Sequence, residues 1–392
     1  MSHHRILRSA GVLLALLVSV SCAAPPATSE RTAVAASAIA TMQRPESSSA
    51  VEPVTRAWNA DELLARQAQE GASVWAEGDE LTFVYQGQAD QVSLCCAIAL
   101  PMQQLPASDI WALSVHVENL AQALISYAFV PKQPGRLPET NLSFSEWRGA
   151  QAPPAPARAE PLRGQIKQYT LPSAALGLER DLTVYLPPDH DPQRATPVIY
   201  LADGESTEQF AEVLEPLIAE GALPPMLLVG VHSASDPADP SGAQRTAEYI
   251  PNVQPSSFAP HERFFVEEVR QWAERELGAA TDRTQRAIFG FSNGAVFAAT
   301  MGIRHPLLYG HVLAFSLGVP PEQLRGSGQD APDFYLVAGT LEEGFHSTTS
   351  AFAATLERSG VRHEFKDRVA GHDHFMWRDE FPAAVRWAFG KR

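Results

Sequence analysis

Cysteine is scarce in this chain, with only Cys22, Cys95 and Cys96 among 392 residues. Three cysteines cannot supply the paired framework that staples small secreted domains, and no Cys and His spacing fits a structural zinc site. Cys95 and Cys96 are adjacent, so on a strand their side chains would point to opposite faces and a bond between them would be strained. We therefore expect both to be buried thiols rather than a redox pair.

Positive charge is also in short supply. The 30 Lys and Arg residues stand against 45 Asp and Glu residues, which gives a formal net charge of −15. Binding the phosphate backbone of DNA or RNA needs a basic face, so the composition excludes nucleic acid as a partner. The same charge disfavours adhesion to anionic lipid headgroups.

The first residues have the pattern of a targeting signal. Two arginines precede the apolar run Gly11–Val20, which has the length of a signal-peptide core and is too short to span a bilayer. A small residue and Cys22 follow, as in bacterial lipoprotein signals, although Ser19 stands where Leu is usual. We expect residues 1–22 to be a lipoprotein-type signal, with Cys22 carrying a lipid that anchors the exported protein in the cell envelope. The alternative is ordinary secretion after cleavage near the same place.

Two further segments differ sharply in composition. Residues 23–55 are rich in Ala, Pro, Ser and Thr without apolar periodicity, which predicts a disordered tether. Residues 56–150 contain short apolar runs at near-regular spacing, separated by turn residues, which predicts a small β-sandwich. Trp111, Tyr127 and Phe129 are expected in its core. Its expected elements are a helix at 61–69 and strands at Leu81–Tyr85, Val92–Leu100, Ile110–Val117 and Ile125–Val130.

The rest of the chain alternates strand-like and helix-like runs. Residues 151–162 are dense in Pro and Ala and predict a linker. Over 163–392 the alternation predicts an α/β domain with a mainly parallel sheet covered by helices on both faces. The expected strands are Asp181–Leu186, Val198–Leu201, Met226–Val231, Arg286–Phe289, His311–Phe315 and Phe334–Val337; the expected helices are Thr207–Ile218, Glu262–Leu277, Ala295–Ile303, Ser347–Ser359 and Phe381–Phe389.

A nucleophile motif stands at Gly290–Gly294. Its sequence, Gly-Phe-Ser-Asn-Gly, matches the pattern G-x-S-x-G, and it follows an apolar strand and opens an apolar helix. In this context the glycines permit a tight turn that lifts the serine hydroxyl clear of the sheet. The first N–H groups of the helix also point at the negative charge that develops during acyl transfer. Ser292 is the predicted nucleophile.

A serine hydroxyl needs a base, because it is barely ionised at neutral pH. In this kind of fold the chain order is serine, then acid, then histidine. Glu342 follows the strand-like run Phe334–Val337, and His372 precedes the last helix, so these are the predicted acid and base. Glu343 is the alternative acid and His374 the alternative base. The two histidines lack further ligands at a known metal spacing, and we expect neither a metal nor a cofactor.

Acyl transfer also needs two N–H donors for the oxyanion of the tetrahedral intermediate. One is predicted at Asn293, the residue after the nucleophile. The other is expected in the loop after the strand Val198–Leu201, where the N–H of Glu205 is the first candidate and that of Gly204 the second.

Four segments together resemble the putative-esterase family, which contains enterochelin esterases, antigen-85-type mycolyltransferases and S-formylglutathione hydrolase. They are Leu178–Pro188, Tyr200–Glu205, Gly290–Gly294 and Gly371–Arg378, and Arg245–Pro251 is similar to the enterochelin-esterase branch. The resemblance runs from about residue 163 to the end of the chain.

This resemblance implies the α/β-hydrolase fold, with Ser292, Glu342 and His372 as catalytic residues. It also implies that the preceding sandwich is an Ig-like early-set module, as in enterochelin esterases. Two features depart from the family. Ala295 stands where many relatives have a second glycine, and the acidic chain would repel an anionic ferric siderophore.

The sequence as a whole predicts a serine esterase that hydrolyses a small-molecule carboxylic ester through an acyl-enzyme. An acyltransferase of the antigen-85 type would use the same three residues, with an alcohol in place of water. A hypothesis from another class is a catalytically idle binding lipoprotein of the cell envelope. Neither the substrate nor the oligomeric state follows from the sequence.

Overall fold

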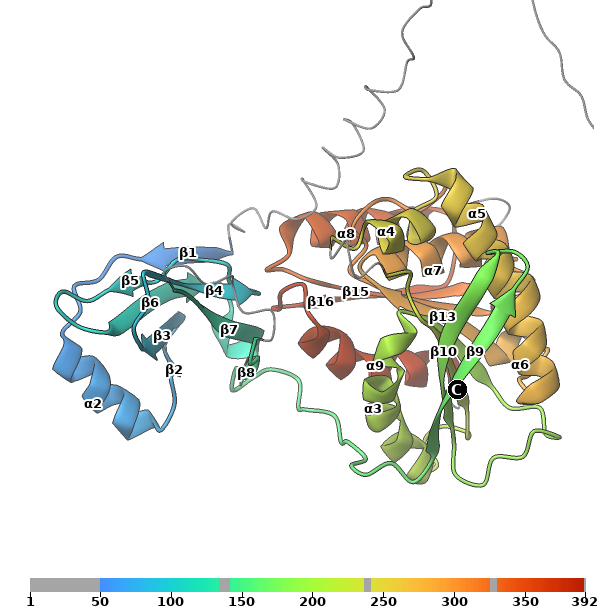
Figure 1. The fold of residues 1–392 in the computed structure, drawn as a ribbon, viewed down its shortest axis with the longest axis horizontal. Helices are drawn as coiled ribbons and strands as arrows, with labels where there is room; N and C mark the ends of the chain where they lie inside the picture. Colours follow the sequence, from blue (N-terminus) through green and yellow to red (C-terminus); the bar gives the residue numbers. More distant parts are fainter. Residues whose placement is uncertain (1–49, 134–141, 236–240, 325–329, 391–392) are drawn as a thin grey trace, which may run out of the picture. The chain divides into compact units, whose positions relative to one another are not determined.

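The computed structural model describes residues 50–133, 142–235, 241–324 and 330–390 (Figure 1). The expected signal peptide, with Cys22, and most of the expected tether lie outside these ranges. The described residues all belong to one compact unit. Within these ranges no helix has the length and hydropathy needed to cross a membrane.

The main sheet runs in the order β16-β15-β14-β13-β11-β12-β10-β9. Strands β11 to β16 pair in parallel, and the hairpin β9–β10 joins antiparallel at one edge. Every residue of the four central strands is buried, as expected for a sheet covered on both faces. The strands are β9 (Gln165–Ser173), β10 (Leu178–Leu186), β11 (Val198–Ala202), β12 (Leu227–Val231), β13 (Arg286–Phe291), β14 (His311–Phe315), β15 (Asp333–Gly339) and β16 (His363–Arg368).

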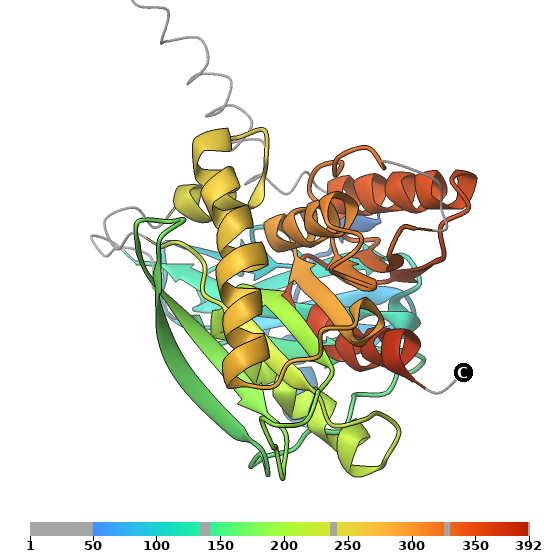
Figure 2. The ribbon, with the colours of Figure 1, turned by 90° about the vertical axis from the view of Figure 1, so that its right-hand side faces the viewer.

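Helices cover both faces of this sheet (Figures 1 and 2). Successive side chains of a strand point to opposite faces, so Tyr200 of β11 joins a core with α5 to α8, and Leu201 joins another core with α3 and α9. The helices are α3 (Thr207–Ala219), α4 (Ala243–Tyr249), α5 (Pro255–Arg263), the π-helical η3 (Phe264–Val269), α6 (Arg270–Glu276), α7 (Asn293–Arg304), α8 (Glu343–Arg358) and α9 (His374–Phe389).

The expected strands and helices of this domain all exist, with shifted ends. Helix α9 begins seven residues before the expected Phe381, because the Asp373 side chain caps it by accepting from the N–H groups of Phe375 and Met376. Two edge strands, β9 and β16, were not expected. Their residues are half exposed and mostly polar, so they lack the continuous apolar run that marks the central strands.

Two antiparallel sheets precede this domain and share one hydrophobic core. Trp111 and Tyr127 are buried in that core and Phe129 packs against it, as expected. The likeness to an Ig-like early-set module stays a prediction. The elements are β1 (Val51–Val54), α2 (Ala60–Glu70), β2 (Val74–Glu77), β3 (Glu80–Gln86), β4 (Gln91–Cys96), β5 (Gln103–Gln104), β6 (Ile110–Val117), β7 (Leu124–Lys132) and β8 (Ser145–Arg148).

The expected end of the tether at residue 55 is wrong. Val51–Val54 forms strand β1, which pairs antiparallel with β6 and buries Val51. Four residues with two apolar side chains are too short a run to be distinguished from a Pro-rich and Ser-rich tether by sequence alone.

The expectation of two separate thiols at Cys95 and Cys96 is also wrong, because the structure joins them in a disulfide. Side chains on opposite strand faces would stay apart only if the strand continued through both residues. It ends there instead: Cys96 has a φ of 90°, outside the extended region, and this turn brings the two sulfur atoms together.

Candidate active site

Ser292 lies on a sharp turn between β13 and α7. Its φ of 57° and ψ of −128° are unusual for a residue with a side chain, and such a conformation costs about 1–3 kcal/mol that the surrounding packing must offset. The turn depends on Gly290, since a Cβ there would lie 2.1 Å from the carbonyl oxygen of Gly294. The motif therefore works as expected from its sequence: strand and helix approach closely, and the serine stands at their junction.

The structure brings the predicted nucleophile, base and acid into one hydrogen-bonded chain. The Ser292 hydroxyl lies 2.9 Å from Nε2 of His372, and Nδ1 of His372 lies 2.5 Å from Oε2 of Glu342. The Glu342 side chain is 2% exposed and that of His372 is 29% exposed. The Glu342 carboxylate is thus shielded from water, whereas the imidazole of His372 stays partly exposed.

The second oxygen of the Glu342 carboxylate is held as well. Oε1 accepts from the hydroxyl of Ser316 at 2.6 Å and from the N–H of Gly339 at 2.7 Å. Ser316 in turn accepts from the indole N–H of Trp377 at 2.8 Å. A buried carboxylate with these partners is fixed in position, so it can orient the imidazole of His372.

Neither alternative residue takes part in this chain of hydrogen bonds, although His374 lines the same cavity as Ser292. Glu343 is exposed on the first turn of α8. The ring of His374 packs against Phe291 and Trp377, with centroids 4.8 and 5.2 Å away. Burial lowers the pKa of His374, which favours its neutral form.

The predicted oxyanion donors flank the nucleophile. Asn293 is the first residue of α7, and Gly204 and Glu205 begin a 3₁₀ turn directly after β11. Glu205 and Ser292 line the same cavity of about 350 Å³. Gly204 packs tightly on β12, since a Cβ there would lie 2.4 Å from the carbonyl of Gly230. The loop after β11 is thus fixed against the sheet beside the serine.

Arg245, to which the sequence alone assigned no role, also lines this cavity. Arg245 of α4 donates to Asp203 through Nε at 2.5 Å and through Nη2 at 2.7 Å. Burial alone would lower the pKa of Arg245, but the Asp203 carboxylate raises it, so the guanidinium stays charged. Asp203 also receives structural support, because its N–H donates to the hydroxyl of Tyr249. In the sequence, Arg245 could be noticed only through the resemblance of Arg245–Pro251 to the enterochelin-esterase branch. Its position beside Ser292 follows from the fold alone.

Asp373 is a second feature that the sequence did not reveal. Burial raises the pKa of this carboxyl to about 7, against the opposing effect of the N–H groups of Met376 and Phe375 that it caps. Among the described residues its Oδ2 has no hydrogen-bond partner. A titratable group therefore lies immediately beside His372 in the chain.

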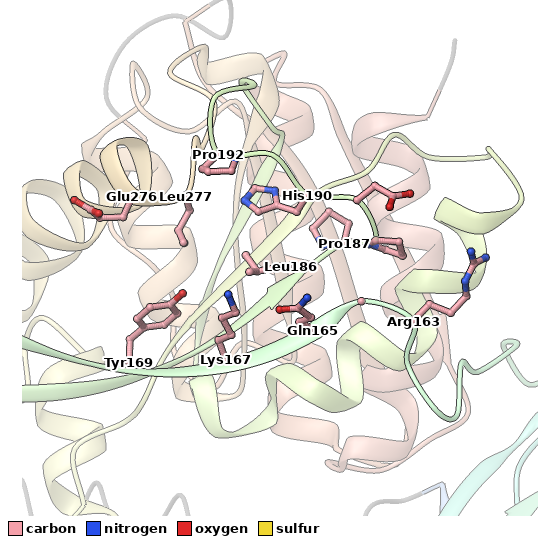
Figure 3. Close-up of a pocket in the computed structure, with 13 residues that line it drawn as sticks. Arg163, Gln165, Lys167, Tyr169, Leu186, Pro187, His190, Pro192, Glu276 and Leu277 are labelled. Carbon is pink, nitrogen blue, oxygen red and sulfur yellow. The ribbon is translucent and has the colours of Figure 1, made fainter.

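A second cavity, of about 580 Å³, is larger than the one beside Ser292. It follows β9 and the loop after β10, and Lys167 and His190 face it in Figure 3. None of the predicted site residues lines it. Hydrogen-bond geometry rather than cavity size therefore identifies the candidate active site. Within the described ranges, no three His, Cys, Asp or Glu side chains gather as a metal ion would need.

A known protein family matches the part of the chain that carries these residues. A family model described as "Putative esterase" matches residues 173–388, which span β10 to α9 and include all three hydrogen-bonded residues. No match was found among curated protein sequences.

Solved structures resemble the fold over more of the chain. Enterochelin esterase from Shigella flexneri matches with a TM-score of 0.63 and 17% identity, over 80% of this chain and 94% of its own. Ferric enterobactin esterase from Salmonella typhimurium matches with a TM-score of 0.65 and 18% identity, over 80% of this chain and 95% of its own. At such low identity these structures establish the α/β-hydrolase fold alone.

Proposed function

We propose that this chain, which belongs to the putative esterase family and is a carboxylic ester hydrolase, acts through an acyl-enzyme formed on Ser292. The observation that carries the proposal is the pair of hydrogen bonds that links Ser292 through His372 to Glu342. This arrangement supplies a nucleophile, a base within reach of its proton, and a buried carboxylate that holds the base.

In the first half-reaction Oγ of Ser292 attacks the ester carbonyl carbon while Nε2 of His372 takes the hydroxyl proton. Glu342 stabilises the imidazolium through Nδ1. The N–H groups of Asn293 and Glu205, or Gly204 in place of Glu205, hold the oxyanion. The tetrahedral intermediate collapses, and the alcohol leaves with the proton from Nε2. In the second half-reaction His372 deprotonates a water molecule, which attacks the acyl-enzyme and releases the acid.

The substrate is proposed to be a small-molecule ester, and the structural neighbours suggest where to begin. The Shigella flexneri enterobactin esterase was solved in the presence of enterobactin, so enterobactin is the first natural ester to offer this protein. The net charge of −15 repels an anionic ferric complex at long range. In the cavity beside Ser292 the guanidinium of Arg245 is paired with Asp203, so it offers an anion only the part of its charge that Asp203 does not offset.

We also propose that the protein is exported and held in the cell envelope by a lipid on Cys22. The apolar run before this cysteine supports the proposal. Cys22→Ala should move the protein from the membrane fraction to the soluble fraction of fractionated cells. Equal distribution of variant and wild type would contradict the anchor.

The test of the proposed function is hydrolysis of p-nitrophenyl acetate by wild type, Ser292→Ala and His372→Ala. Each substitution should lower kcat about a thousandfold or more, as loss of a member of such a triad does. Matched controls are Ser347→Ala and His116→Ala, which alter exposed side chains away from the site and should stay within twofold of wild type.

Labelling gives a second readout. An aryl phosphonate that reacts with activated serines should attach to the peptide that carries Ser292, and mass spectrometry locates it. Equal activity of Ser292→Ala and wild type would show that the nucleophile is wrong. A wild type that is inert to both ester and phosphonate would reject the proposal in favour of an idle scaffold.

A further inference from the structure

The loop that carries the base rests on the turn after β4, in the N-terminal β-sheets. Gly371, immediately before His372, packs so closely on Ala97 that a Cβ at residue 371 would lie 2.5 Å from both Cα and Cβ of Ala97. Real Cβ atoms do not approach other atoms so closely. The backbone beside the catalytic base therefore has no freedom to move toward Ala97.

The acid is held from the same side. Leu341, immediately before Glu342, is 7% exposed and belongs to the hydrophobic core of the N-terminal sheets. Its N–H donates to the carbonyl of Ala370 at 3.0 Å, and the N–H of Leu124 in β7 donates to the carbonyl of Val369 at 2.8 Å. The acid and base loops are thus bonded to each other, and both contact the N-terminal sheets.

A disulfide fixes the turn that meets Gly371. Cys95 and Cys96 are joined directly before Ala97, and both side chains are partly exposed. The φ of 90° at Cys96 is a conformation that residues with side chains rarely adopt, and it persists only when something holds it. The bond between adjacent residues supplies that restraint.

We propose that the disulfide-closed turn Cys95–Ala97 is a positioning element for the catalytic base: through Gly371 it holds His372 between Ser292 and Glu342. The inference rests on the proposed function above, which it deepens. Reduction by a dithiol releases the element. The dithiol gives two electrons and two protons, the sulfur–sulfur bond breaks, two thiols form, and the reductant becomes a disulfide. The turn then relaxes, and Gly371 loses its fixed neighbour.

The first experiment compares the oxidised and dithiothreitol-reduced forms of the full-length protein. Before reduction the peptide that carries Cys95 and Cys96 should take up no alkylating reagent, and after reduction two equivalents. Reduction should lower kcat about tenfold to a hundredfold with KM within twofold, because misplacing a catalytic group by about 1 Å has effects of this size. The double variant Cys95→Ala/Cys96→Ala should have the low kcat of the reduced protein, and dithiothreitol should not change it. Cys22→Ala should respond like wild type.

A pair of glycine substitutions tests the contact without redox chemistry. Gly371→Ala should lower kcat at least tenfold, and adding Ala97→Gly should recover part of the loss because it removes one of the two colliding atoms. The matched control is Gly344→Ala. Residue 344 lies two positions after Glu342, a Cβ there has open space, and the variant should keep wild-type kcat.

A third readout needs no substrate. The proton between Nδ1 of His372 and Glu342 should give a low-field NMR resonance in the oxidised protein, absent in His372→Ala, that weakens or shifts on reduction. Two reactive thiols before reduction, or identical kcat and resonance in both redox forms, would overturn the inference and leave the proposed function intact. An oxidised wild type without esterase activity would overturn the proposed function, while the resonance still decides whether the turn positions His372.

Discussion

At the scale of single residues, two adjacent glutamates of the same chemistry differ in environment. Glu342 is buried and bonded to His372, and Glu343 is exposed one residue later. The chain order and the position after a strand predict that the acid is one of these two glutamates. They do not say which one, because burial depends on how the loop after β15 folds. The same holds for His372 and His374, which are equally placed in the sequence and are separated by the turn at the start of α9.

Replacing Glu342 with Gln should lower kcat about a hundredfold or more. The amide keeps the size of the side chain but loses the charge that stabilises the imidazolium, and its NH₂ can hold His372 in the wrong tautomer. Glu343→Gln makes the same chemical change on an exposed side chain and should leave kcat within twofold. Steady-state hydrolysis of p-nitrophenyl acetate measures both. A larger loss in Glu343→Gln would exchange the two roles.

Asp373 should make stability depend on pH between about 4 and 7. Its pKa is raised to about 7 by burial, whereas in the unfolded chain it is near 4. Between these values the unfolded state binds fewer protons, so the free energy of unfolding falls as the pH rises and is lowest above about 7. Asp373→Asn keeps the helix cap and cannot ionise, so it should lose less stability than wild type between pH 5 and pH 8.

Urea unfolding at pH 5 and pH 8 measures this difference. The matched control is Asp79→Asn in an exposed turn, which should follow the wild-type dependence. Parallel curves for wild type and Asp373→Asn would show that this carboxyl ionises normally in the folded protein.

At the scale of elements, Glu215 of α3 ties that helix to the edge hairpin. Its carboxylate accepts from the N–H groups of Arg163 and Gly164 at 2.7 Å and from the hydroxyl of Tyr185 at 2.9 Å. Burial, together with this carboxylate, raises the pKa of Tyr185, which keeps the hydroxyl protonated as a donor.

Glu215→Gln should therefore lower the free energy of unfolding by about 1–3 kcal/mol. The amide presents an NH₂ group where a buried donor needs an acceptor, and an unsatisfied buried donor costs about that much. The exposed Glu208→Gln on the same helix should change stability by less than about 0.5 kcal/mol. Urea unfolding at pH 7 measures the stability of both variants. Equal losses would show that the three hydrogen bonds to Glu215 contribute no net stability.

Whether a strand could be predicted from the sequence depends on its position in the sheet. The central strands are buried on both faces, so their sequences are continuous apolar runs, and the six that were predicted are all present. Strands β9 and β16 at the sheet edges carry Lys, Glu and Asp, and β1 has only four residues. None of the three therefore shows a clear periodicity of apolar residues. The turn at Cys96 was not predictable, because its φ of 90° depends on the neighbouring bond rather than on local propensity.

At the scale of the whole molecule, the net charge of −15 should govern how charged esters reach the site. For an ester that carries a carboxylate, kcat/KM should rise about twofold to fivefold when salt is raised from 0.01 M to 0.15 M, since the screening length falls from about 30 to about 8 Å. A neutral ester of the same shape is the control and should not respond. A decrease for the anionic ester would show that the local charge of Arg245 outweighs that of the molecule.

Leu341 lies in the hydrophobic core of the N-terminal sheets and immediately precedes Glu342, the proposed catalytic acid. This contact limits which N-terminal sheets can be combined with this C-terminal domain. Exchanging the N-terminal sheets for those of a distant homologue would replace the surface on which residues 341 and 371 rest, even though no catalytic residue changed. The two domains should therefore be inherited together, and a chimaera should recover activity only if the donor brings a small residue opposite Gly371.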